Sequence, residues 1–163
     1  MRLLVIGGKE KAKRKYLWYH QRVESEAAEK DAQGAGQSVQ PAADSEGKIL
    51  VVEDDSDMRE VMEFMLEQLG VGVVLAGSVE EAAAAAKNQK VSLIISDLGL
   101  PGQSGLDLIR VLGCKGTIPA IALSGYGAEE DVRASRAAGF TEHLVKPVTP
   151  DKLLEAVRKL IGQ

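Results

Sequence analysis

The chain has 163 residues, of which 45% are hydrophobic and 27% charged, and its formal net charge is −4 at pH 7. That length accommodates one ordinary domain of about 100–150 residues plus an extension, and such a domain buries a core without disulfides or metal. The mild acidity disfavours nucleic acid as the main partner, and the single cysteine, Cys114, excludes an internal disulfide. No apolar run reaches the roughly 20 residues of a membrane helix and no secretory signal is present, so we expect a cytoplasmic protein without a membrane span.

Residues 1–47 differ in character from the rest of the chain, and we expect no independent domain in them. The basic cluster "KEKAKRK" precedes the aromatic sequence "YLWYH", and a polar stretch follows from Glu24 to Gly47. That stretch has no periodic apolar residues to offset its ordering entropy, which predicts a flexible linker. The basic and aromatic residues fit a mobile tail or short helix without a defined role, or a docking segment for a partner or membrane surface. The opening "LLVIGG" is similar to a strand that enters a glycine turn, although the dinucleotide-binding pattern is incomplete.

From Lys48 onward, short apolar runs alternate with segments whose apolar residues recur at helical spacing. Continuous apolar runs are typical of strands that are buried on both faces of a parallel sheet. Ser78 and Thr149 stand where N-cap residues are expected. The expected strands cover 48–52, 71–77, 91–97, 118–124 and 140–145, and the expected helices cover 58–70, 78–89, 104–112, 128–139 and 149–162. This alternation predicts one α/β domain over 48–163, with a parallel sheet and right-handed crossovers.

Polar residues stand at the carboxyl ends of four of these strands, where open parallel sheets bind their ligands. They are Glu53 and Asp54 after the first strand, Asp97 at the end of the third, Ser124 at the end of the fourth and Lys146 after the fifth. Carboxylate oxygens suit a hard divalent cation, and we expect Mg²⁺. A lysine opposite a metal-bound acidic pocket indicates a phosphate as the further ligand.

Two more acids follow closely in "VVEDDSD" but are not expected in the metal site. We expect Asp55 to be a solvated loop charge. Asp57, together with Ser56, is expected to cap the helix that follows.

The motifs "VVEDD", "ISDLGLPGQSGLDLI", "ALSGYG" and "HLVKPV" occur in this order and at compatible spacing. Together they closely resemble the receiver domain of two-component response regulators, over about residues 48–162. The last two motifs also look similar to receivers attached to hybrid histidine kinases, so the chain is either a free-standing relative or part of such a kinase. The resemblance implies the doubly wound, five-stranded flavodoxin-like fold with strand order 2-1-3-4-5.

The resemblance also implies which residues hold the metal and accept phosphate. Asp97 would be the phosphoacceptor, which takes a phosphoryl group from a histidine kinase or a histidine phosphotransfer protein with Mg²⁺. Asp54 would bind the metal directly and Glu53 through water. The backbone carbonyl of Gly99 would supply a further protein ligand beside Asp97.

Other matched positions concern the phosphoryl group itself. Ser124 would bond a phosphoryl oxygen and move with phosphorylation, and Lys146 would pair with the phosphate. Gly125 would leave access to the phosphoryl group. Gly99 leaves space for water whereas Tyr126 would cover the site, so the dephosphorylation rate stays open.

The switch position of the fifth strand, which is often Tyr or Phe in this family, is His143 here. We expect His143 to rotate inward when Ser124 is drawn to the phosphoryl group. That rotation would change the surface formed by the strand at 140–145 and the helices at 128–139 and 149–162. A partly exposed strand histidine without a switch role is the alternative.

The resemblance implies a signalling protein that is not an enzyme beyond its own phosphorylation and dephosphorylation. No helix-turn-helix segment follows the last helix, so we expect a single-domain regulator or a phosphorelay intermediate without a DNA-binding output domain. Two other classes stay open: a pseudo-receiver that binds protein without being phosphorylated, and a hydrolase with an aspartate nucleophile. The hydrolase requires a second acid soon after the nucleophile, where Gly99 stands. The sequence names neither the kinase, nor the downstream protein, nor the oligomeric state.

Overall fold

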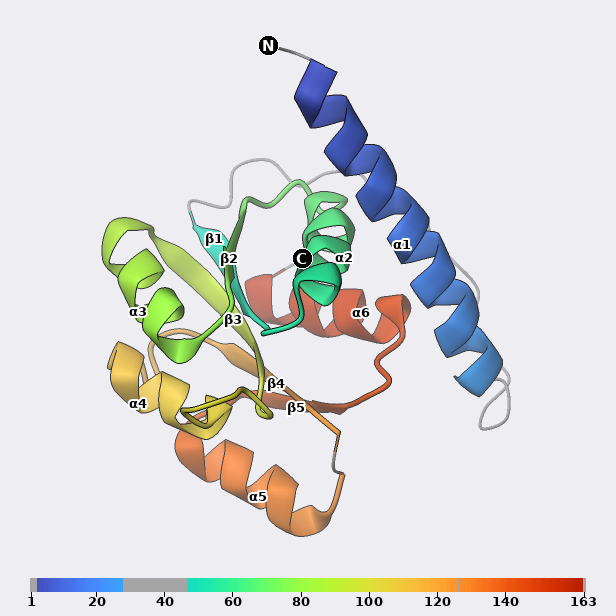
Figure 1. Ribbon diagram of the computed structural model, residues 1–163. Coiled ribbons are helices and arrows are strands. Elements are labelled where there is room, and N and C mark those ends of the chain that lie inside the picture. The colour runs from blue at the N-terminus through green and yellow to red at the C-terminus, as the bar shows by residue number, and fades with distance from the viewer. Residues whose placement is uncertain (1–2, 28–46, 126, 163) are drawn as a thin grey trace.

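The computed structural model describes residues 3–27, 47–125 and 127–162 (Figure 1). Most of the stretch predicted as a flexible linker, residues 28–46, lies outside the described residues, and so does Tyr126. No helix in the described ranges is both long and apolar enough to cross a membrane.

A five-stranded parallel sheet forms the centre of the fold, in the order β2-β1-β3-β4-β5. The strands are β1 Lys48–Val52, β2 Val73–Ala76, β3 Val91–Asp97, β4 Ala120–Ser124 and β5 Glu142–Val145. This order confirms the predicted doubly wound fold. Val52 pairs with Ser96, and Asp97 pairs with Leu123. The register therefore brings the carboxyl ends of β1, β3 and β4 to the same edge of the sheet.

Helices cover both faces of the sheet (Figure 1). One layer holds α2 Ser56–Glu67 and α6 Pro150–Ile161, and the other holds α3 Val79–Asn88, the 3-10 helix η1 Gly105–Asp107, α4 Leu108–Leu112 and α5 Glu129–Ala138. Alternate residues of β1 face the two layers: Ile49 and Val51 belong to the core cluster with α2 and α6, and Leu50 and Val52 to the cluster with α3 and α4. Burial on both faces explains the uninterrupted apolar runs.

Two of the three predicted helix caps are confirmed. The side chains of Ser78 and Thr149 each accept a backbone N–H from the first turn of the following helix. The predicted cap of α2 is wrong, because Asp55 caps this helix and accepts the backbone N–H groups of Asp57 and Met58. Asp55 has extended backbone dihedrals, whereas Asp57 already lies inside the helix, where its carboxylate is no longer placed to cap.

The helix predicted over 104–112 is divided into η1 and α4. Gly105 lies directly against the end of β3, because a Cβ atom at this position would stand 2.2 Å from the backbone carbonyl oxygen of Asp97. Only glycine permits this approach, so the loop after β3 can fold back against the end of the strand at Asp97.

The N-terminal residues form one long helix, α1 Leu3–Ala27, which lies beside α2 (Figure 1). The similarity of "LLVIGG" to a strand is therefore misleading, since these residues are helical. Ala12 and Val23 are buried, and the Tyr16 ring lies against Phe64 of α2 with 5.4 Å between the ring centroids.

Polar contacts also attach α1 to the domain. Lys15 forms ion pairs with Asp57 and with Glu60 of α2, the latter at 2.8 Å. The Tyr19 hydroxyl donates to the backbone carbonyl oxygen of Val148 at 3.0 Å. These contacts join α1 to the segments that follow β1 and β5, which also carry residues of the candidate site.

Candidate functional site

The loop after β1 is held by Arg59 of α2. Its Nη1 donates to the backbone carbonyl oxygens of Glu53 at 2.6 Å and Asp54 at 2.9 Å. The sequence interpretation missed Arg59, although a basic residue in the first turn of the helix after two acids was a usable signal. Arg59 fixes the backbone from which both acidic side chains extend.

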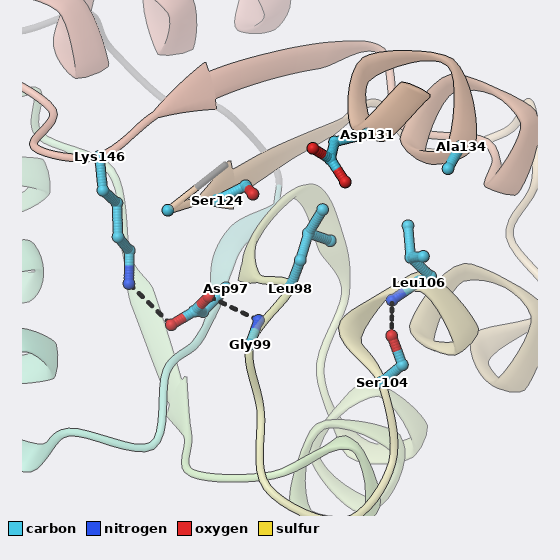
Figure 2. Close-up of a pocket in the computed structure, with 10 residues that line it drawn as sticks. Asp97, Leu98, Gly99, Ser104, Leu106, Ser124, Asp131, Ala134 and Lys146 are labelled. Carbon is cyan, nitrogen blue, oxygen red and sulfur yellow. Dashed lines mark hydrogen bonds and ion pairs between the residues drawn. The ribbon is translucent and has the colours of Figure 1, made fainter. Parts of the chain in front are cut away.

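Asp97 ends β3 with both carboxylate oxygens occupied, and only 8% of the residue is exposed. Its Oδ1 accepts the backbone N–H of Gly99 at 2.8 Å, and its Oδ2 accepts from Lys146 Nζ at 2.7 Å (Figure 2). These two contacts come from opposite sides and fix the orientation of the carboxylate.

Lys146 also binds a second carboxylate, because its Nζ donates to Glu53 Oε2 at 3.1 Å. Glu53 is 3% exposed, and burial raises the pKa of its carboxyl group even though the charge of Lys146 opposes that change. For Lys146, burial works against the charged form, but the bond to Asp97 and the charges of both acids outweigh it, so its pKa is raised. The ammonium therefore stays charged near neutral pH.

The acidic group has the composition of a divalent-cation site. One carboxylate oxygen from each of Glu53, Asp54 and Asp97 lies within 4.8 Å of the others. Asp54 is exposed while the other two acids are buried, so the group opens toward solvent on one side. A single lysine neutralises only part of its negative charge. Oxygen donors with excess negative charge fit Mg²⁺.

A cavity of about 400 Å³ opens beside this group (Figure 2). Four of the residues predicted to hold the metal or the phosphoryl group line it, namely Asp97, Gly99, Ser124 and Lys146. Gly125 also lines it, and a Cβ at this position would meet no atom within 4 Å. The parallel register thus brings together the predicted acidic, hydroxyl and ammonium groups.

His143 is not among the residues that line this cavity. It lies half-buried in β5, with its Nδ1 2.9 Å from the hydroxyl of Ser135 in α5. Ser135 is fully buried. The histidine is thus tied to the helix that covers this edge of the sheet rather than to the acidic group.

Comparison with known proteins identifies the family. Residues 49–158 match the family model of the response regulator receiver domain. The chain belongs to this family. Receiver domains are signalling modules of two-component systems, and the five-stranded order agrees with their CheY-like flavodoxin fold.

Curated relatives of the receiver include an uncharacterised 14.6 kDa protein of Leptolyngbya boryana. It is 40% identical over 114 residues, which cover 68% of this chain and 87% of that protein. The transcriptional regulatory protein AruR of Pseudomonas aeruginosa is 33% identical over 119 residues, 70% of this chain. The match covers 49% of AruR, so the receiver corresponds to about half of that regulator.

Solved structures agree with this assignment. A response regulator receiver protein from Pseudomonas putida is 33% identical, with a TM-score of 0.63, and the match covers 76% of this chain and 99% of that one. The chemotaxis protein CheY4 of Vibrio cholerae is 27% identical with a TM-score of 0.65, covering 70% of this chain and 98% of that one.

Proposed function

We propose that this receiver accepts a phosphoryl group on Asp97 from the phosphohistidine of a histidine kinase or phosphotransfer protein. The observation that supports it is the setting of Asp97, an almost buried carboxylate that Lys146 and the Gly99 N–H orient at the wall of an open cavity. A carboxylate oxygen would attack phosphorus while the N–P bond breaks, and its electron pair would return to the imidazole. The product is an acyl phosphate on Asp97.

Phosphoryl transfer depends mostly on positioning and on neutralising charge, and the surrounding side chains are suited to both. Lys146, whose raised pKa keeps it charged, can leave Asp97 Oδ2 and pair with a phosphoryl oxygen. The hydroxyl of Ser124, which also lines the cavity, can donate to another phosphoryl oxygen.

We assign Mg²⁺ to the acidic group, held by Glu53, Asp54, Asp97 and the backbone carbonyl of Gly99. When bound, the ion would neutralise the excess negative charge of the carboxylates and of the incoming phosphoryl oxygens. Arg59 would act on the metal site through the backbone that carries Glu53 and Asp54.

We further propose that residues 48–163 carry this activity in the cytoplasm, with residues 1–47 as an accessory segment rather than a second domain. The described part of that segment, α1, supports the proposal because its Tyr16 and Tyr19 side chains pack against the core of the domain. We keep His143 as the switch residue, and its bond to Ser135 would let movement in β5 reach α5.

Phosphorylation by acetyl phosphate or phosphoramidate with Mg²⁺ tests the proposed function. Intact-mass measurement should show one phosphoryl group on the wild type and none on Asp97→Asn. Asp107→Asn is the matched control, because Asp107 is a surface acid that pairs with Arg110 outside the cavity, and it should be labelled normally. An unlabelled wild type would favour the pseudo-receiver, and donor turnover without an accumulating phosphoprotein would favour the hydrolase.

A further inference from the structure

The cavity at Asp97 extends well beyond the space that a phosphoryl group needs. Its volume of about 400 Å³ lies within the range of small-molecule sites. Figure 2 shows Asp97 and Lys146 on one wall of the cavity, and Leu106 of η1 with Asp131 and Ala134 of α5 on the opposite wall. The part away from Asp97 therefore has room for the group from which the phosphoryl group departs.

Asp131 of α5 faces this part of the cavity (Figure 2). Among the described residues, its carboxylate has no hydrogen-bond or ion-pair partner. Two other acids in the same helical turn, Glu129 and Glu130, already complement the helix N-terminus, yet both are exposed and neither lines the cavity. Asp131 thus gives the cavity a negative end opposite Lys146.

We propose that Asp131 is a specificity-determining residue that selects phosphoryl donors by the charge of their leaving group. This inference rests on the proposed function. A phosphoimidazole protonated on its far nitrogen presents an N–H and positive charge toward Asp131. When Asp97 forms its O–P bond, the N–P electron pair returns to the ring, which leaves as neutral imidazole and retains that proton. Acetyl phosphate instead releases acetate, whose developing negative charge Asp131 repels.

The preference is therefore for nitrogen-linked donors, the chemical class that includes phosphohistidine. The side chains of Leu106 and Ala134 on the same wall provide apolar contact for a flat ring. Lys146 attracts the phosphoryl group of either donor, so Asp131 is the residue that distinguishes the two.

The test measures initial rates of Asp97 phosphorylation on the full chain, with saturating Mg²⁺ and either phosphoimidazole or acetyl phosphate. Asp131→Asn should raise the acetyl phosphate rate by roughly threefold and lower the phosphoimidazole rate by a similar factor, as expected for one partly screened charge. Glu129→Gln, which removes a charge from the same turn outside the cavity, should leave the ratio of the two rates unchanged.

An unchanged ratio in Asp131→Asn, or an equal change in Glu129→Gln, would overturn the selection by Asp131 and leave the phosphoacceptor function intact. If neither donor labels the wild type, the phosphoacceptor function itself fails and the inference fails with it. Thermal unfolding of both variants checks that each remains folded.

Discussion

Replacement of Lys146 by methionine should destabilise the metal-free protein, because it leaves two almost buried carboxylates without their shared cation. Oxygens of Glu53 and Asp97 lie within 4.8 Å of each other. At an effective dielectric constant of about 20, two unit charges at that distance repel by about 3.5 kcal/mol. The Lys146 side chain is 33% exposed, so solvent screens part of this energy, and we expect a loss of about 2 kcal/mol.

Urea unfolding of Lys146→Met in EDTA and in excess Mg²⁺ measures this loss. The difference from wild type should shrink with Mg²⁺, since the ion supplies positive charge at the same carboxylates. Asp97→Asn added to Lys146→Met should recover much of the stability in EDTA, because one repelling charge is gone. Lys87→Met is the control, as Lys87 is exposed and has no ion pair among the described residues. Full stability of Lys146→Met in EDTA, or an equal loss with and without Mg²⁺, would refute the reasoning.

Three further predictions concern the acids after β1 and the switch. Asp54→Ala should abolish Mg²⁺-dependent phosphorylation by acetyl phosphate, whereas Asp55→Ala should retain it but lose about 1 kcal/mol of stability in urea, because α2 loses its N-cap. His143→Ala should alter the phosphorylation rate or the affinity for a phosphorylation-dependent partner, and unchanged values of both would remove the switch role. The bond and charge of Lys15 hold the pKa of Asp57 below its ordinary 3.8. The ion pair should therefore stabilise the docking of α1 fully at pH values above 3.8. This stabilisation should be lost as the pH falls through the lower pKa that Asp57 has when α1 is docked. Amide hydrogen exchange of α1 should follow this pH dependence in wild type and lack it in Asp57→Asn.

The sequence was sufficient to predict the fold and the proximity of the polar residues at the carboxyl ends of the strands, although His143 lies outside the cavity. Asp97 and Lys146 are far apart in the chain, but both stand at carboxyl ends of predicted strands. In a parallel sheet all such ends lie at one edge, so strand order and approximate boundaries decide the proximity without any side-chain detail. The prediction thus required only the positions of the strands, which the continuous apolar runs indicate.

Local choices between similar residues were harder to predict. Asp55, Ser56 and Asp57 can all cap a helix, and the backbone dihedrals that select Asp55 follow from how Arg59 and the strand hold the loop. Sequence pattern does not contain that information, because a shift of one or two residues leaves the pattern unchanged.

The sequence contains a weak indication that α1 packs against the domain. Ala12, Tyr16, Tyr19 and Val23 recur at spacings of four, three and four, which places them on one helical face. Tyr16 and Tyr19 pack against the core of the domain, and Ala12 and Val23 are buried. Two of these four residues are tyrosines beside a basic cluster and one is alanine. This helical face is therefore only slightly more hydrophobic than the rest of the helix. Docking against α2 and the segment after β5 buries part of this face.

The four acids from Glu53 to Asp57 are compatible because three of them face different positive groups and the fourth, Asp54, is exposed to water. Glu53 bonds Lys146, Asp55 accepts the N–H groups at the positive end of α2, and Asp57 pairs with a lysine of α1. Asp54 is exposed to water and adjoins the proposed ion. Since these counter-charges lie on separate elements, neutralising Asp55 or Asp57 removes neither contact of Lys146 with Glu53 and Asp97. Lys146 offsets part of the repulsion within the acidic group, and the proposed Mg²⁺ would offset more of it, so metal affinity should respond to Asp54 and not to its neighbour Asp55.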